Sequence, residues 1–306
     1  MNDKVKVYSA PMAGITDKPF RQMLRQFSET PIFTEMIGVE TLVHHHAKTL
    51  KMLQIQDEKN IIVQLVGAKP ESFAQAVPIV EDAGAVGIDI NMGCPVKKLI
   101  QNHSGAELMR HVDLAKRLVE AVKQKTALPV SVKTRLGWQD ANELESFVCA
   151  LDEVGADRLE VHARTKMQGF SGHADWSVVG KSRGAFQMPV IINGDIVDYT
   201  SAQQALNQSC ADGVMIGRAL LGRPWKLAEI ESGHLIKPSM VNVVLDHLEK
   251  LLSFYGRAGI FVARKHLAWY AKNKKNVAEW REKMYLEEDE TRLKQMIIDF
   301  FDEGEQ

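Results

Sequence analysis

Short runs of β-branched and other apolar residues alternate with longer amphipathic stretches, and this alternation constrains the fold more than any other feature of the chain. About eight such runs are present. They span residues 5–10, 32–35, 61–65, 86–91, 130–133, 158–162, 190–193 and 213–216. Helical patterns over 70–83, 112–123, 143–154 and 201–208 lie between them. Strands that alternate with helices indicate a parallel sheet, and this number of units predicts an eight-stranded parallel β/α (TIM) barrel.

The pattern changes near Pro238. After this residue the strand-like runs give way to helical patterns at 241–255, 261–272, 277–285 and 288–301. We therefore expect a barrel domain over residues 1–237 and a small helical domain over residues 238–306. A chain of 306 residues suits one barrel with such an appendage.

Overall composition excludes several classes of protein. The 38 Lys+Arg and 39 Asp+Glu give a formal net charge of −1, so any surface for a polyanion must be local. Cys94, Cys149 and Cys210 are too scattered for a disulfide framework or a CxxC metal motif, which favours a reducing cytoplasm. The first residues lack the pattern of a secretory leader, and no apolar run approaches the ~18 residues of a membrane span. We expect a cytoplasmic monomer without an obligate protein partner or membrane contact.

Residues at the strand exits are the candidates for a site, because catalytic groups of β/α barrels lie at the C-terminal ends of the strands. Small and polar residues are concentrated there. The set comprises Pro11, Met12, Ala13, Gln64, Cys94, Lys133, His162, Asn193, Gly194, Asp195, Gly217 and Arg218. We expect these residues to converge on one rim of the barrel.

Glycines at the last two strand exits indicate a phosphorylated ligand. Gly194 and Gly217 allow backbone N–H groups to approach a phosphate, and Arg218 adds positive charge. Either glycine alone is more typical of an ordinary turn, but their presence on both strands favours the phosphate. Gln64 and Lys133 offer the amide and the cation that the pyrimidine edge of a flavin needs, although Lys133 alone could be a surface lysine.

Seven segments occur in an order typical of one enzyme family. They are APMAGITDKPFR (10–21), DINMGCPVKK (89–98), SVKTRLGW (131–138), VHARTK (161–166), INGDI (192–196), MIGRALLGRPW (215–225) and ARKHLAWY (263–270). Through them the chain resembles the flavin-dependent tRNA-dihydrouridine synthases, and above all the bacterial synthase B type. The resemblance runs from Tyr8 to the C-terminal helices, and NMGCP is its most discriminating motif.

The resemblance implies a cofactor and a reaction. FMN would contact Pro11, Met12, Ala13, Gln64, Lys133 and His162, with its phosphate against Asn193, Gly194, Asp195, Gly217 and Arg218. NADPH, or NADH, would reduce the FMN. The reduced flavin would give hydride to C6 of a uracil in folded tRNA, in the D loop by the nearest resemblance, and Cys94 would protonate C5.

A thiol suits the role of acid, because a pKa near ~8.5 keeps Cys94 protonated around pH 7. The alternative for Cys94 is a small buried hydrophobe, and Gly93 and Pro95 argue against it because they would shape an exposed loop. We expect Cys149 and Cys210 to be inert core residues.

Three adjacent histidines, His44, His45 and His46, look like a metal cluster. Neighbouring helical residues point about 100° apart, however, whereas ligands on a helix usually need i, i+4 spacing. We therefore expect no metal site.

Basic residues gather in the helical region between positions 257 and 283, where only Glu279 and Glu282 oppose them. The tRNA contacts that we expect among them are Arg264, Lys265, Lys272, Lys274 and Lys275. Trp269 and Tyr270 could stack on exposed bases or fill the core of the helical domain, and the charges could form an ordinary solvated face.

Two positions depart from the family pattern. After Lys98 the segment 100–103 is neutral rather than basic, and Glu107 follows, so an RNA-phosphate contact near Cys94 is missing or supplied elsewhere. Ala163 replaces a usual glycine, where we expect a small adjustment of the backbone.

Two other functions fit parts of the pattern. One is an FMN-dependent reductase of a free small molecule such as a pyrimidine, against which the basic helical region argues. The other is a non-catalytic RNA-binding protein that keeps the fold, against which an intact set of Cys94, Lys133 and Gln64 argues. Turnover on folded tRNA compared with free uracil separates the first from the synthase, and a flavin-free protein would favour the second.

Overall fold

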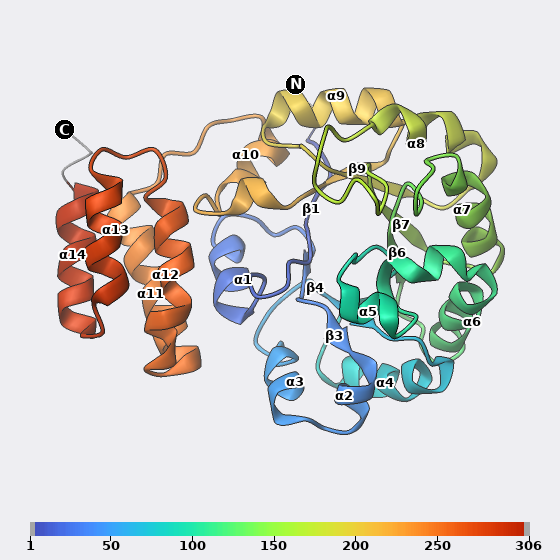
Figure 1. The fold of residues 1–306 in the computed structure, drawn as a ribbon, viewed down its shortest axis with the longest axis horizontal. Coiled ribbons are helices and arrows are strands. Elements are labelled where there is room, and N and C mark those ends of the chain that lie inside the picture. Colours follow the sequence, from blue (N-terminus) through green and yellow to red (C-terminus); the bar gives the residue numbers. More distant parts are fainter. Residues whose placement is uncertain (1–3, 303–306) are drawn as a thin grey trace.

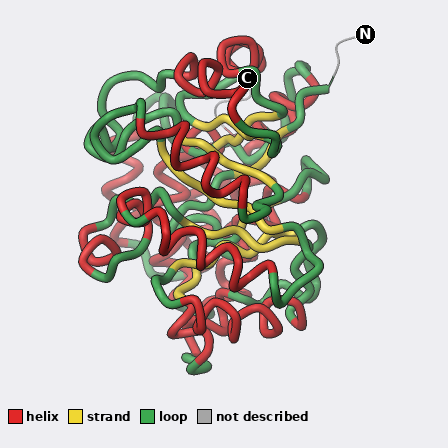
Figure 2. The backbone as a smooth tube through the Cα atoms, turned by 90° about the vertical axis from the view of Figure 1, so that its right-hand side faces the viewer, coloured by secondary structure: helices red, strands yellow, loops and turns green. Residues whose placement is uncertain are grey.

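A computed structural model describes residues 4–302. In Figure 1 the parallel strands lie at the centre of a ring of helices, and the C-terminal helices form a separate group at one side. Figure 2 shows the strands running through the middle of the molecule with helices outside them. The predicted barrel with C-terminal helices is confirmed. The boundary between 237 and 238 stays a prediction, and residues 1–3 and 303–306 of the two expected domains lie outside the described residues.

The strands belong to one parallel sheet. They are β1 (Val7–Ser9), β2 (Ile32–Phe33), β3 (Ile37–Gly38), β4 (Ile61–Val66), β5 (Gly87–Asn91), β6 (Val130–Arg135), β7 (Arg158–His162), β8 (Val190–Asn193) and β9 (Gly213–Ile216). Their order is β1-β9-β8-β7-β6-β5-β4-β2, and β3 also pairs with β4. Eight strand positions therefore follow one another around the barrel, with β2 and β3 sharing one of them.

The second strand position differs from the single run expected over 32–35. Phe33 pairs with Ile62 and Ile37 with Leu65, so four steps on one strand face three steps on β4. The side-chain hydroxyl of Thr34 accepts the backbone N–H of Gln64 at 3.1 Å. The segment from Phe33 to Ile37 therefore contains one residue more than the facing part of β4, and the Thr34 hydroxyl takes the place of a backbone carbonyl in the ladder. Such an insertion is a β-bulge, and it splits the expected strand into β2 and β3.

Contacts between β1 and β2 bring the ends of the sheet together. The backbone N–H of Phe33 donates to the hydroxyl of Ser9 at 3.1 Å, and the rings of Tyr8 and Phe33 meet edge to face at 6.4 Å. The barrel is therefore nearly closed.

Ten α-helices precede the C-terminal group within the described residues. They are α1 (Lys18–Arg25), α2 (Val39–Val43), α3 (Ala47–Met52), α4 (Pro70–Asp82), α5 (Lys97–Gln101), α6 (Val112–Lys123), α7 (Glu143–Glu153), α8 (Trp176–Ser182), α9 (Tyr199–Ser209) and α10 (Lys226–Ser232). The 3₁₀ turns are η1 (Gly105–Arg110), η2 (Arg183–Ala185) and η3 (Arg218–Leu220). The predicted bounds of α6 match those observed because its apolar residues Leu118, Val119 and Val122 recur at helical spacing and are all buried. In the described part of the chain, no helix is long and apolar enough to cross a membrane.

The C-terminal group consists of α11 (Met240–Tyr255), α12 (Ala258–Tyr270), α13 (Val277–Leu286) and α14 (Glu290–Asp302). These helices share an apolar core of their own, which includes Leu267 and Ile297. Met23 of α1 and Trp225 join this core from the barrel side. The helical group is therefore packed against the barrel rather than tethered to it.

Polar contacts fix the helical group near the exit of β1. The hydroxyl of Tyr255 donates to Oδ2 of Asp17 at 3.0 Å, and Nζ of Lys265 donates to the carbonyl of Gly14. The ring of Phe20 stacks on His266 with centroids 5.7 Å apart. Asp17 also caps α1 by accepting from the backbone N–H of Phe20. The orientation of α12 relative to the first strand exit is thereby determined.

Candidate active site

A cavity of about 1100 Å³ opens at the C-terminal ends of the strands. Every strand-exit residue expected from the sequence lines it. These are Pro11, Met12, Ala13, Gln64, Cys94, Lys133, His162, Asn193, Gly194, Asp195, Gly217 and Arg218. Trp269 and Lys272 of the C-terminal group complete part of the same lining. The structure thus brings the set together, and the role of each residue stays a prediction.

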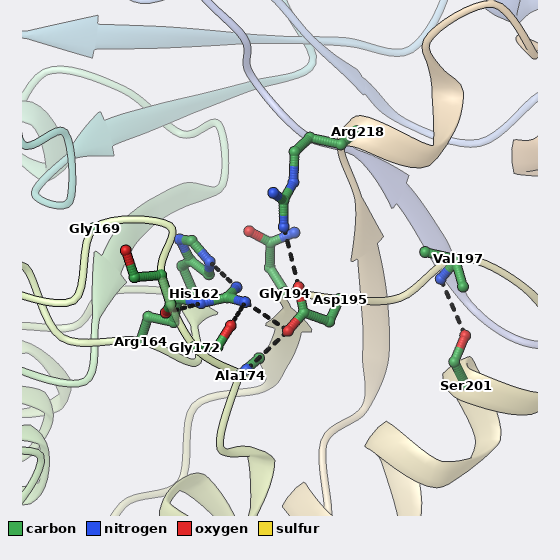
Figure 3. Close-up of polar contacts among 12 residues, drawn as sticks. His162, Arg164, Gly169, Gly172, Ala174, Gly194, Asp195, Val197, Ser201 and Arg218 are labelled. Carbon is green, nitrogen blue, oxygen red and sulfur yellow. Dashed lines mark hydrogen bonds and ion pairs between the residues drawn. The ribbon is translucent and has the colours of Figure 1, made fainter. Parts of the chain in front are cut away.

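Asp195 joins two guanidinium groups at the exit of β8 (Figure 3). Its Oδ2 accepts from Nη2 of Arg164 at 2.6 Å and from the backbone N–H of Ala174 at 2.8 Å, and its Oδ1 accepts from Nη2 of Arg218 at 3.0 Å. Burial opposes ionisation of Asp195, but the hydrogen bonds and the two cations outweigh it and hold its pKa below the usual value. Arg164 is buried, whereas the side chain of Arg218 is 59% exposed. Arg218 is therefore oriented by Asp195 while it remains accessible.

Gly194 precedes this carboxylate in a conformation that suits glycine. Its φ is +120°, and a Cβ there would come within 2.9 Å of the Cβ of Ala174. A side chain at position 194 would therefore be strained and would crowd the turn.

His162, the last residue of β7, is neutral beside these cations. Its Nε2 lies 3.2 Å from Nη1 of Arg164. Burial, reinforced by the positive charges of Lys133 and Arg135, lowers the pKa of His162 to about 2. A neutral ring can accept from Arg164 through Nε2 and donate through Nδ1.

Lys133 supplies a cation from β6. Its Nζ lies 3.5 Å from Oδ1 of Asn193. Burial, together with the charge of Arg135, lowers the pKa of Lys133 to about 8, so the ammonium form predominates at pH 7. The alternative of a simple surface lysine is wrong, because the side chain lines the cavity.

A series of side-chain hydrogen bonds orients the amide of Gln64. Nε2 of Gln64 donates to Oδ2 of Asp89 at 2.6 Å, and its Oε1 accepts from Nδ2 of Asn91 at 2.9 Å. Asp89 is fully buried and also accepts from the hydroxyl of Ser131 at 2.8 Å. Because an amide has two donors and two acceptor sites, Gln64 keeps one of each for a ligand.

The same series reaches Cys94 in the loop after β5. Oδ1 of Asn91 accepts the backbone N–H of Cys94 at 2.9 Å, and Nε of Arg135 donates to the carbonyl of Gly93 at 2.8 Å. Cys94 is half-buried at the cavity, less exposed than the loop expected from the sequence. Burial raises the pKa of its thiol despite the opposing hydrogen bond from Val96 and charge of Arg135. The thiol is therefore protonated at neutral pH.

Several residues with a place in this geometry had no role in the sequence analysis. Asn91 links Gln64 to Cys94, Arg135 holds the Cys94 loop, and Arg164 anchors Asp195. Phe170 lines the cavity and is 61% exposed. Arg135 and Arg164 lie at strand exits, and this position is the signal in the sequence that could have identified them. The sequence does not show their partners, because Gly93 and Asp195 come from other loops.

Two of the expected tRNA contacts are exposed. Lys272 and Lys275 follow α12, and Lys272 lines the mouth of the cavity together with the half-buried Trp269. Tyr270 is buried instead, and its hydroxyl lies 3.0 Å from Nδ1 of His247. Of the two aromatic residues, Trp269 therefore faces the cavity and Tyr270 fills the core.

The other three expected contacts donate to carbonyls of the protein itself. Nζ of Lys274 donates to Phe300 and Phe301 at 3.4 and 3.2 Å, near the end of α14. Lys265 donates to Gly14, and Nη2 of Arg264 donates to the carbonyl of Glu287 at 3.4 Å. These three side chains stabilise the fold through these contacts, and their contact with RNA stays a prediction.

The expectations for the remaining cysteines and histidines need correction. Cys149 is half-buried and Cys210 is exposed, so neither is a core residue. Cys210 ends α9 with a φ of +51°, which directs it out of the apolar pattern that precedes β9.

The run 44–46 is not helical: the three exposed histidines lie in the turn between α2 and α3.

Comparison with known proteins identifies the family. Residues 8–304 match the family described as Dihydrouridine synthase (Dus). The chain belongs to the dihydrouridine synthase family. The resemblance inferred from the seven motifs is thus confirmed, as is the expectation of an oxidoreductase.

Relatives match over almost their full length. The chain is 43% identical over 277 residues to a "Probable tRNA-dihydrouridine synthase" of Rhodobacter capsulatus, covering 87% of this chain and 86% of the relative. It is 36% identical over 306 residues to a protein of the same description from Rickettsia bellii, covering 95% and 93%. It is 37% identical over 308 residues to "tRNA-dihydrouridine synthase B" of Xanthomonas axonopodis pv. citri, covering 97% and 93%.

Solved structures share the barrel. An old yellow enzyme homologue from Zymomonas mobilis superposes with a TM-score of 0.57 at 13% identity, over 78% of this chain and 91% of that one. Histamine dehydrogenase from Rhizobium sp. 4-9 gives a TM-score of 0.59 at 13% identity, over 80% and 49%. At this identity the likeness concerns the fold alone.

Proposed function

We propose that the protein is a tRNA-dihydrouridine synthase that reduces the C5–C6 double bond of a uridine in folded tRNA, in the D loop, with FMN as cofactor and NADPH, or NADH, as reductant. The observation that carries the proposal is the shared cavity of Cys94, Lys133 and Arg218. A protonated thiol, a half-buried cation and an accessible guanidinium then serve one reaction: proton donation, stabilisation of negative charge and phosphate binding.

FMN fits the residues present. A volume of about 1100 Å³ slightly exceeds the ~300–1,000 Å³ typical of ligand sites, enough for a flavin mononucleotide and a uracil ring. Arg218, with Gly194 and Gly217, would hold the phosphate, while Lys133 and Gln64 would hold the pyrimidine edge of the ring. Pro11, Met12, Ala13 and His162 would contact the ring, and Asn193 and Asp195 would support the phosphate end. When bound, FMN supplies the hydride chemistry that carries two electrons from NADPH to C6 of uracil.

Cys94 would provide the proton for C5. The raised pKa keeps the proton on Sγ until a carbanion-like centre develops at C5, which is the condition for a general acid. The positive charge of Arg135 then favours the thiolate that remains. Asn91 and Arg135 hold the loop on either side of position 94, so the direction of proton transfer is set by the fold.

The tRNA would approach along the end of α12. Lys272 and Lys275 offer exposed cations for phosphates, and Trp269 offers a ring at the cavity for a base turned out of its stack. We extend the proposal to a tRNA-binding domain over residues 238–306, with Arg264, Lys265 and Lys274 contributing to its surface charge. The exposed lysines and the aromatic ring beside the cavity favour a tRNA substrate, and thus the synthase over a reductase of free pyrimidines.

The proposal is tested with the purified, flavin-loaded protein and NADPH. Folded tRNA from a strain lacking the gene, unfolded tRNA, and free uridine or uracil are compared as substrates, and dihydrouridine is quantified by mass spectrometry of the nucleosides. We expect product on folded tRNA, at a position mapped to the D loop. Equal turnover of free uracil would instead assign the protein to the small-molecule reductases.

A further inference from the structure

Three potential metal ligands converge beside the loop that carries Cys94. One ligand atom from each of His103, Glu107 and His111 lies within 4.8 Å of the others. Nε2 of His111 is 3.5 Å from Oε1 of Glu107, and the two imidazole rings meet edge to face with centroids 5.8 Å apart. His103 lies in the turn after α5, Glu107 in η1, and His111 immediately before α6.

Glu107 lacks a partner for one of its oxygens. Its side chain is 9% exposed, and Oε1 accepts from Nη1 of Arg110 at 3.1 Å. Within residues 4–302, the buried Oε2 has no hydrogen-bond partner. A buried carboxylate with an unpaired oxygen is unfavourable, and a cation bound by the carboxylate would offset this cost.

We infer that His103, Glu107 and His111 form a binding site for one divalent cation of the zinc type. Two imidazoles and one carboxylate are ligands that Zn²⁺ prefers, and the exposure of both histidines leaves a fourth position to water. Bonds of ~2.1 Å in tetrahedral geometry separate ligand atoms by roughly 3.4 Å. The ligand atoms now lie within 4.8 Å of one another, so metal binding would require the two exposed imidazoles to turn toward the buried Glu107.

Arg110 is the competing cation. Its guanidinium pairs with Glu107 and lies 5.0 Å from the ring centroid of Trp138, and its side chain is 55% exposed. The arginine half of this pair is exposed, so Arg110 can turn toward solvent when the metal replaces it at the carboxylate.

The site would position the Cys94 loop rather than take part in the reaction. The backbone N–H of Ala106 donates to the carbonyl of Cys94 at 3.0 Å. Gly105, with a φ of +62°, approaches so closely that a Cβ would lie 2.7 Å from the same carbonyl. A metal that joins α5, η1 and α6 would therefore restrain the segment against which Cys94 is held.

The experiment is a calorimetric titration of the chelator-treated, flavin-loaded protein with Zn²⁺. We expect one tight site per chain, at least 10-fold weaker in His103→Ala and in His111→Ala, because even indirect partners of metal ligands change affinity by ~10–100-fold. The matched control is the triple change His44→Ala, His45→Ala and His46→Ala, which removes exposed histidines elsewhere and should leave the tight site intact. Arg110→Gln should bind Zn²⁺ at least as tightly as the unchanged protein.

Hydrogen exchange provides a readout independent of activity. Zn²⁺ should slow amide exchange over residues 97–111 in the unchanged protein and not in His103→Ala. Binding that persists in both single variants, or that disappears only with the 44–46 change, would overturn the site and leave adventitious surface binding. Weaker binding by Arg110→Gln would overturn it as well, since the carboxylate would then depend on the arginine.

Discussion

Nη2 of Arg218 lies 3.0 Å from Oδ1 of Asp195, and this ion pair holds an otherwise exposed guanidinium over one end of the cavity. The opposite oxygen of Asp195 is bound by the buried Arg164. The carboxylate is thus anchored before any ligand arrives. A cation that is oriented in advance loses less conformational entropy on binding an anion.

Arg218→Ala should weaken FMN retention by roughly 10- to 150-fold, since a hydrogen bond to a charged group contributes ~1.5–3 kcal/mol. The exposure of Arg218 places the expected value toward the lower end of this range. Fluorescence titration of the apoprotein with FMN measures the affinity. Arg117→Ala, an exposed arginine of α6, is the matched control. An unchanged affinity in Arg218→Ala would refute the phosphate assignment.

Cys94→Ala should separate the two half-reactions. Reduction of the bound flavin by NADPH should continue. The rate of dihydrouridine formation should fall on the order of 10³-fold, within the range of about 10²–10⁴ that general acids typically contribute. Cys94→Ser should fare little better, because a hydroxyl is a far weaker acid. Stopped-flow absorbance and a tRNA turnover assay measure the two steps, with Cys149→Ser and Cys210→Ser as controls. Near-normal turnover by Cys94→Ala would end the case for a thiol acid.

The pH dependence of product formation should follow the Cys94 thiol. An acid acts in its protonated form, so its contribution is present below the pKa and is lost as the pH rises through it. Because burial raises the pKa, the loss should begin above the ordinary thiol value of ~8.5. Single-turnover product formation with pre-reduced protein measures this limb. In Cys94→Ala the residual rate should lack it, and an identical limb in that variant would assign the titration to another group.

Charge reversal at the exposed pair Lys272→Glu and Lys275→Glu should weaken tRNA binding and make it less dependent on salt. Each lost phosphate contact lowers the slope of log K against log salt by roughly one unit. Reduction of the flavin by NADPH should be unaffected. Filter binding over a series of salt concentrations gives the slope. Lys125→Glu with Lys181→Glu, two exposed lysines of the barrel, serves as the control.

Lys274→Glu should behave differently from that pair. Its ammonium donates to the carbonyls of Phe300 and Phe301, so the change should also lower the stability of the C-terminal helices.

If the variant with Lys272→Glu and Lys275→Glu bound tRNA like the unchanged protein, the RNA surface would have to lie on the barrel rim.

His266→Leu should reduce the loss of stability in mild acid. Burial holds the pKa of His266 well below 6.5, so the folded state keeps the ring neutral while the unfolded chain takes up a proton. The free energy of unfolding therefore decreases as the pH falls below 6.5, by about 1.4 kcal/mol per pH unit for each such histidine. Urea unfolding at pH 7, 6 and 5 should show a shallower decline in the variant. The exposed His234→Leu is the control, and equal slopes for both variants would contradict the assignment.

The amino-acid sequence was sufficient for the architecture and for the strand-exit residues that it assigned to the cavity. Apolar periodicity located β7, β8 and β9 and the helix α6, because burial on one face leaves a regular trace in the chain. Parallel strands of a barrel end on the same rim, so residues as distant as Pro11, Cys94 and Arg218 could be assigned to one cavity. The motifs gave the family for the same reason: the residues of the rim lie within short, ordered segments.

Only the tertiary structure decided how those residues are held and which charges remain accessible. The partners of Asn91, Asp195 and Lys274 come from other segments, and no local periodicity records a contact made across space. The convergence of His103 with His111 depends on a left-handed residue, φ +52° at position 103, between a helix and a 3₁₀ turn. Such backbone reversals are set by packing around them, so side-chain direction there follows from the folded loop and not from the spacing along the chain.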